Sequence, residues 1–94
     1  MRVEWTNKAT GLLDAAGEFI ARDNPAAAGR VVERISQSAD RLADFPNMGR
    51  PGREDGTREL IVAGSPFILV YRVGSDVVQV LSVLHGAQEW PETE

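Results

Sequence analysis

The chain of 94 residues is 43% hydrophobic and 26% charged, which is typical of one small globular domain rather than of a disordered segment. Its net charge of −4 argues against a broadly basic nucleic-acid-binding protein, although it leaves room for a local cationic patch. The chain has no cysteine and one histidine, so it predicts neither a disulfide nor a protein-only metal site. We therefore expect a single domain over residues 1–94 that holds no cofactor and no metal.

The N-terminus and the hydrophobic runs bear on where the protein resides. Residues 1–5, MRVEW, lack the pattern of a secretory signal peptide. No run approaches the roughly 18 apolar residues that a membrane-spanning helix needs. We expect a cytoplasmic protein without a membrane partner.

The beginning of the chain predicts a short strand followed by an amphipathic helix. Val3 and Trp5 alternate with polar residues, as in a half-buried strand, and Thr6 or Asn7 can cap the helix that follows. Apolar residues then recur at steps of three and four, the spacing of one helix face: Ala9, Leu12, Leu13, Ala16, Phe19 and Ile20. We expect Trp5 and this stripe to lie in the core, or to continue it into a partner-binding groove.

A second amphipathic helix follows after a short link. Asn24 is a suitable N-cap, and Pro25 at the first helical position loses no needed hydrogen bond. The apolar stripe of this helix consists of Ala28, Val31, Val32, Ile35, Ala39 and Leu42. So short a link predicts an antiparallel helix hairpin, whose apolar stripes need a sheet to cover them.

The segment 46–56 is rich in glycine and proline and predicts an irregular loop. It has few apolar anchors, so we expect it to be mobile without a partner. Four of the ten basic residues lie in or after this segment: Arg50, Arg53, Arg58 and Arg72.

Three strands are then predicted, over residues 58–62, 67–73 and 76–84. Gly74 and Ser75 suit a two-residue hairpin turn, which would place Val73 opposite Asp76 and Tyr71 opposite Val78. Alternation along these strands places Ile68, Val70, Arg72, Val77, Gln79, Leu81, Val83 and His85 on one face, the more polar and open one. The fold class is α+β: a short N-terminal strand, an antiparallel helix hairpin and a three-stranded antiparallel meander packed on the helices.

Three segments resemble the RelE/ParE superfamily of bacterial toxins, and their order matches as well. They are DNPAAA at residues 23–28, LADFPNMGRP at residues 42–51, and the pair VYRV at 70–73 and LHG at 84–86. The first two are similar to the helix link and the helix exit of ParE-type members, and the third to the last hairpin of the fold. The resemblance covers nearly the whole chain.

This resemblance implies a toxin of a type II toxin–antitoxin system. The expected partner is a ParD-like antitoxin, a ribbon-helix-helix dimer whose C-terminal segment wraps the toxin. The antitoxin binds operator DNA, so the toxin meets DNA only indirectly. A small domain with apolar helix and strand surfaces offers such a wrapping segment an area to bury.

The superfamily has two kinds of target, and one position separates them here. RelE-type toxins cleave messenger RNA on the ribosome, whereas ParE-type toxins inhibit DNA gyrase by binding it. RelE-type members carry an arginine early in the central strand, where this chain has Ile68. Isoleucine cannot stabilise the phosphorane charge of RNA cleavage. We expect a ParE-like protein that binds DNA gyrase and is not an enzyme.

The candidate target-binding residues are Arg50, Arg53, Arg58, Arg72, His85 and Trp90. A structural role competes with the functional one for each, for example a solvated loop charge for Arg50 and an ion pair with another element for Arg58. One alternative is a RelE-like, ribosome-dependent mRNA endonuclease that uses His85 and Arg58. Another is a decayed toxin kept as a binding module.

Overall fold

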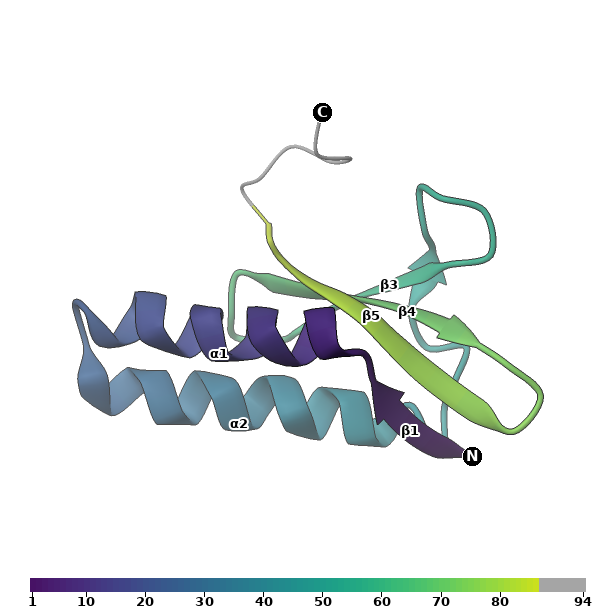
Figure 1. The fold of residues 1–94 in the computed structure, drawn as a ribbon, viewed down its shortest axis with the longest axis horizontal. Coiled ribbons are helices and arrows are strands. Elements are labelled where there is room, and N and C mark those ends of the chain that lie inside the picture. The colour runs from purple at the N-terminus through teal and green to yellow at the C-terminus, as the bar shows by residue number, and fades with distance from the viewer. Residues whose placement is uncertain (87–94) are drawn as a thin grey trace.

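The computed structural model describes residues 1–86 and shows two helices and five strands. Their bounds are β1 Arg2–Trp5, α1 Asn7–Ala21, α2 Pro25–Arg41, β2 Arg50–Pro51, β3 Arg58–Ile61, β4 Phe67–Val73 and β5 Val77–His85. The helix hairpin lies against one side of a twisted sheet, and β1 lies beside β5 near the N-terminus (Figure 1). No helix in this described part of the chain is long and apolar enough to span a membrane.

The sheet confirms the predicted α+β class and adds two features to it. Its strand order is β1-β5-β4-β3-β2, so the predicted meander β3-β4-β5 forms its centre. β1 pairs with β5 in parallel, with Val3 opposite Val78, and the sheet is therefore mixed. β2 is a two-residue edge strand that pairs with β3. It lies within segment 46–56, for which the sequence predicts only an irregular loop.

The caps of both helices lie where the sequence predicts them. Thr6 Oγ1 accepts a hydrogen bond from the Ala9 N–H at 3.0 Å, and Asn24 Oδ1 accepts one from the Ala27 N–H at 3.1 Å. Each bond satisfies an N–H group that the helix itself leaves without a partner. Because the two caps fix where each helix begins, they also fix which faces meet in the hairpin.

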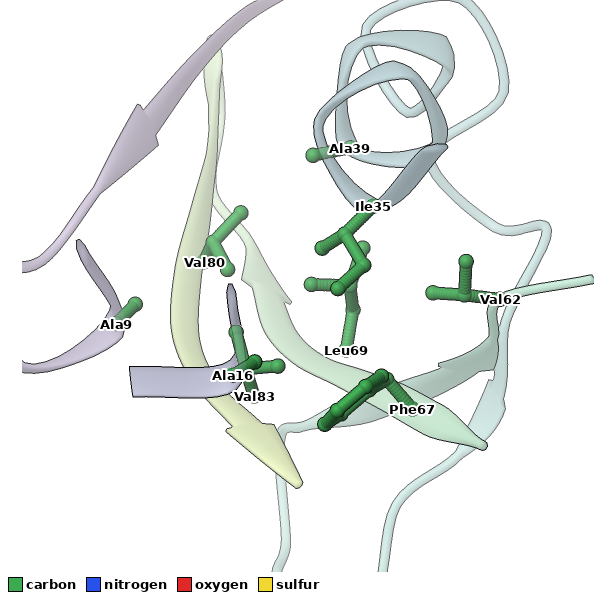
Figure 2. Packing of buried hydrophobic residues seen from close by; sticks show 9 residues of the cluster. All are labelled: Ala9, Ala16, Ile35, Ala39, Val62, Phe67, Leu69, Val80 and Val83. Atoms are coloured by element: carbon green, nitrogen blue, oxygen red, sulfur yellow. The ribbon is translucent and has the colours of Figure 1, made fainter. Parts of the chain in front are cut away.

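The core lies between the helices and one face of the sheet. Ile35 of α2 points toward Leu69 of β4, and both are fully buried (Figure 2). Trp5 is half-buried and packs against this cluster. The face of β4 that carries Phe67, Leu69 and Tyr71 therefore meets the helices, as predicted.

The predicted hairpin register is wrong in two ways. First, the turn is longer than two residues: Val73 lies opposite Val78, and the Gly74 N–H bonds the Val77 carbonyl at 2.7 Å. Second, a β-bulge interrupts the pairing, because Tyr71 lies opposite Val80 but Val70 lies opposite Ser82. Leu81 is the extra residue of this bulge.

The bulge changes the face on which the end of β5 lies. Beyond it, Val83 pairs with Leu69 and His85 with Phe67. Since directly paired residues share a face, Val83 and His85 lie on the helix-facing side. The prediction that these two residues share the open face with Ile68 is therefore wrong.

Candidate functional site

Three of the predicted arginines surround the turn between α2 and β3. Arg58 Nη1 donates a hydrogen bond to the Gly49 carbonyl at 2.7 Å, so its guanidinium fastens the chain that precedes β2. We expected Arg58 to pair with an acidic side chain of another element; its bond instead goes to a backbone carbonyl. This contact gives Arg58 a structural role, whatever else it contacts in a complex.

Arg50 and Arg53 meet at one buried carboxylate, that of Glu59. Glu59 is 4% exposed, and its Oε1 lies 3.3 Å from Arg50 Nη2. Its Oε2 accepts a hydrogen bond from the Arg53 N–H at 3.2 Å. The Arg50 side chain remains 53% exposed, so it can neutralise Glu59 and still present N–H donors to a partner.

Tyr71 holds the same segment from the core. Its hydroxyl donates to the Pro46 carbonyl at 2.8 Å and accepts from the Gly49 N–H at 2.9 Å. Burial raises the pKa of this phenol above its ordinary value of 10.0, while the Gly49 hydrogen bond and the charge of Arg58 partly offset that rise. Polar contacts from Tyr71, Arg58 and Glu59 thus hold segment 46–53. The glycines and prolines of the segment itself do not indicate these contacts.

His85 lies in a groove between α1 and β5, away from Arg50, Arg53 and Arg58. Its ring meets Phe67 edge-on, with centroids 5.5 Å apart, and meets Phe19 edge-on at 6.4 Å. The groove has a volume of about 620 Å³, and Lys8 and Arg22 are the cations among its lining residues. Phe19 is 55% exposed, so the stripe of the first helix does continue from the core into a concave surface.

The face of the sheet that points away from the helices carries a row of aliphatic side chains. Ile61 of β3 lies opposite Ile68 of β4, and Ile68 lies opposite Leu84 of β5. Their strand neighbours Leu60, Val62, Leu69 and Val83 all contact the core, so this row points to the other side. Ile61 is 58% exposed. We call this side the open face.

The next row of the open face is mostly polar and, apart from Arg50, buried: Glu59 is 4%, Val70 3% and Ser82 6% exposed. Arg50, Glu59, Val70 and Ser82 follow one another across β2, β3, β4 and β5. Beyond them, Arg72 lies opposite Gln79 and close to Gly56 of the loop before β3. Arg72 is exposed and has no ion pair among residues 1–86.

The structure therefore brings together only part of the predicted site. Arg50, Arg53 and Arg58 gather around β2, whereas His85 lies on the opposite side of the sheet from Ile68 and Arg72. Trp90 lies outside the described residues. The sequence prediction missed Lys8 and Arg22 of the groove, although their spacing on one helix places both on the same side as Leu12 and Phe19.

Comparisons with known proteins agree with this geometry. Residues 3–90 match the family described as the ParE toxin of the type II toxin–antitoxin system parDE. A candidate toxin, Y4kP of Sinorhizobium fredii, is 47% identical over 91 residues, which are 97% of this chain and 94% of that protein. Toxin RelE2 of Caulobacter vibrioides is 33% identical over 87 residues, which are 93% of this chain and 97% of that protein.

Solved structures show the same fold. The chromosomal ParDE toxin–antitoxin system from P. aeruginosa superposes with a TM-score of 0.83 at 28% identity, covering 90% of this chain and 95% of that one. The intact E. coli RelBE complex superposes with a TM-score of 0.64 at 17% identity, covering 94% and 98%, and this likeness concerns the fold alone. The chain belongs to the ParE toxin family and is the toxin of a type II toxin–antitoxin system.

Proposed function

We propose that this toxin acts by binding a protein, DNA gyrase, and that a ParD-like antitoxin neutralises it. The observation that carries the proposal is the separation of His85 from Arg50 and Arg58, the arginines expected to act with it in RNA cleavage. His85 contacts phenylalanine rings in the α1–β5 groove, whereas Arg50 and Arg58 lie around β2. RNA cleavage needs a proton-transfer group and a cation at one phosphate, and His85 does not meet Arg50 or Arg58 at one point. The cations beside His85 are Lys8 and Arg22, in the groove that we assign to the antitoxin.

The open face also supports a binding role rather than RNA cleavage, because it lacks a cation at a decisive position. Where an RNA-cleaving relative would hold an arginine, Ile68 lies in a row of aliphatic side chains. Affinity for RNA depends on lysine and arginine contacts to phosphate, and an aliphatic row supplies none. The name of the relative RelE2 keeps the RelE-like alternative worth testing.

The α1–β5 groove is the surface we assign to the antitoxin. Leu12, Phe19 and Phe67 give it apolar walls, and Lys8 and Arg22 add positive charge. An amphipathic segment with apolar anchors and acidic flanks is complementary to such a groove. The N-terminal part of an antitoxin bound there would be the part that binds operator DNA, so the toxin would contact DNA only indirectly.

Expression of the toxin without its antitoxin tests the proposal. We expect growth arrest without codon-positioned cuts when the 5′ ends of transcripts are mapped after induction. Growth arrest accompanied by such cuts would support the RelE-like endonuclease instead. Normal growth at confirmed expression would favour the decayed toxin. The choice of gyrase as the target is tested directly by DNA supercoiling, as described at the end of the Discussion.

A further inference from the structure

We propose that the open face is the surface that docks the protein target, through the aliphatic row Ile61–Ile68–Leu84 with the arginines beside it. This inference rests on the proposed function in that it assumes a toxin that acts by binding a protein. It assigns to the target the open face, which adjoins the α1–β5 groove at Leu84.

The exposure of the row favours docking. Ile61 is 58% exposed, and Ile68 and Leu84 are half-buried, in a row that crosses three neighbouring strands. Single exposed aliphatic residues are common, but a contiguous aliphatic row across neighbouring strands is a typical interaction surface. β2 pairs with β3 only at Glu59 and Arg58, so this strand does not cover Ile61.

Positive charge lies next to the row. Arg50 and Arg72 lie on the same face, and the one carboxylate paired within it, Glu59, is buried against Arg50. Arg72 lies four positions after Ile68 along β4, a distance of about 13 Å. A complementary partner surface would carry an aliphatic or aromatic patch for the row and carboxylates about 13 Å from that patch for Arg72. Glu54 and Asp55, which are exposed in the neighbouring loop, limit how acidic that partner surface can be.

The chemistry of the row favours a protein over RNA as its occupant. Single-stranded RNA is held by phosphate contacts and by stacking of bases on aromatic rings. The row contains no aromatic ring and no cation, whereas buried aliphatic contacts are typical of protein interfaces. The α1–β5 groove shares Leu84 with this row, but neither Ile61 nor Ile68 lines it, so the surfaces proposed for the target and the antitoxin adjoin at β5.

A pair of variants matched in exposure and charge tests this surface. Ile61→Glu places a carboxylate in the row, and Phe45→Glu places one at a side chain of equal exposure, 59%, in the turn after α2. Both sites are exposed, so we expect both variants to keep the thermal unfolding midpoint of the wild type. With immobilised DNA gyrase as the probe, we expect affinity to fall at least about tenfold for Ile61→Glu and less than about twofold for Phe45→Glu. Equal binding by wild type and Ile61→Glu would overturn the surface while leaving gyrase as the target.

A growth assay separates failure of the surface from failure of the proposed target. If the wild type does not bind gyrase but arrests growth, relief of that arrest by Ile61→Glu and not by Phe45→Glu supports the surface with a different protein target. Growth arrest that survives Ile61→Glu overturns it, as does a wild type that arrests nothing. Three further results also overturn it: codon-positioned RNA cuts that Ile61→Glu abolishes, loss of antitoxin binding alone, and a wild-type dimer that Ile61→Glu dissociates.

Discussion

The ring of His85 lies edge-on to the ring of Phe67, with centroids 5.5 Å apart, on the side of the sheet that faces the helices. The bulge at Leu81 causes this placement, because it turns the end of β5 over by one residue. The only histidine of the chain therefore packs in the wall of the groove and lies away from Arg50, Arg53 and Arg58.

Replacement of His85 by phenylalanine should preserve toxicity. The substituted ring keeps the contacts with Phe67 and Phe19 but can neither donate nor accept a proton. We expect the inducer concentration that arrests growth to change by no more than about twofold. Removal of a general acid or base typically lowers a catalysed rate by about a hundredfold or more, so a loss of that size would point to catalysis by His85.

Tyr71→Phe should lower the free energy of unfolding at neutral pH. It should also remove the decrease in that free energy which the wild type shows at alkaline pH. The substitution leaves the Pro46 carbonyl and the Gly49 N–H without a buried partner, which costs about 1–3 kcal/mol. The pKa of the folded phenol is raised, so above pH 10 the unfolded chain releases a proton that the folded chain keeps. The wild type should lose stability as the pH rises above 10, whereas the tyrosine contribution is fully present below that value.

Denaturant unfolding of the wild type and Tyr71→Phe across this pH range measures both effects. The chain has one tyrosine, so phenolate absorbance reports its titration without interference from another tyrosine. A wild type and a variant whose unfolding free energies fall in parallel above pH 10 would contradict the assignment to Tyr71.

Two glycine substitutions should change stability in opposite directions. A Cβ at Gly49 would lie 2.7 Å from the Glu59 carbonyl oxygen and 2.8 Å from the Tyr71 hydroxyl, so Gly49→Ala should cost about 1–3 kcal/mol. A Cβ at Gly29, on α2, meets nothing within 4 Å. Gly29→Ala should stabilise the protein by about 0.5–1 kcal/mol through its helix propensity. Thermal unfolding of both variants checks the contrast, and equal shifts of the same sign would refute it.

Arg50→Ala should destabilise the fold more than Arg72→Ala does. Removal of Arg50 leaves the buried Glu59 carboxylate without its ion pair, at a cost of about 1–2 kcal/mol that is limited by the exposure of Arg50. Arg72 has no ion pair among residues 1–86, so its removal should cost little. Adding Glu59→Gln to Arg50→Ala should recover part of the loss, because no buried charge then remains. A double variant as unstable as the sum of both single variants would count against this coupling.

The sequence predicted those parts of the fold that depend on local patterns. The caps at Thr6 and Asn24, the helix stripes and the burial of Leu69 follow from chemistry within a few residues. The bulge at Leu81 did not, because β5 is a continuous run of strand-forming residues in which no glycine or proline marks an extra one. An error of one residue there reversed the predicted face of His85.

The candidate site was less predictable because its contacts join distant segments. Tyr71 meets Pro46 and Gly49 across more than twenty positions of the sequence, and Glu59 meets Arg50 only once β2 is paired with β3. No local propensity encodes such pairs. The role of Ile68 came from the family resemblance, and only the cross-strand register showed that Ile61 and Leu84 extend it into a row.

Inhibition of DNA supercoiling by the purified toxin tests the central claim most directly. Relaxed plasmid, ATP and DNA gyrase are incubated with increasing toxin, and supercoiled product is measured on a gel. We predict that toxin at micromolar concentration blocks supercoiling and that prior addition of the antitoxin restores it. Full supercoiling by gyrase at a large excess of folded toxin would contradict the account.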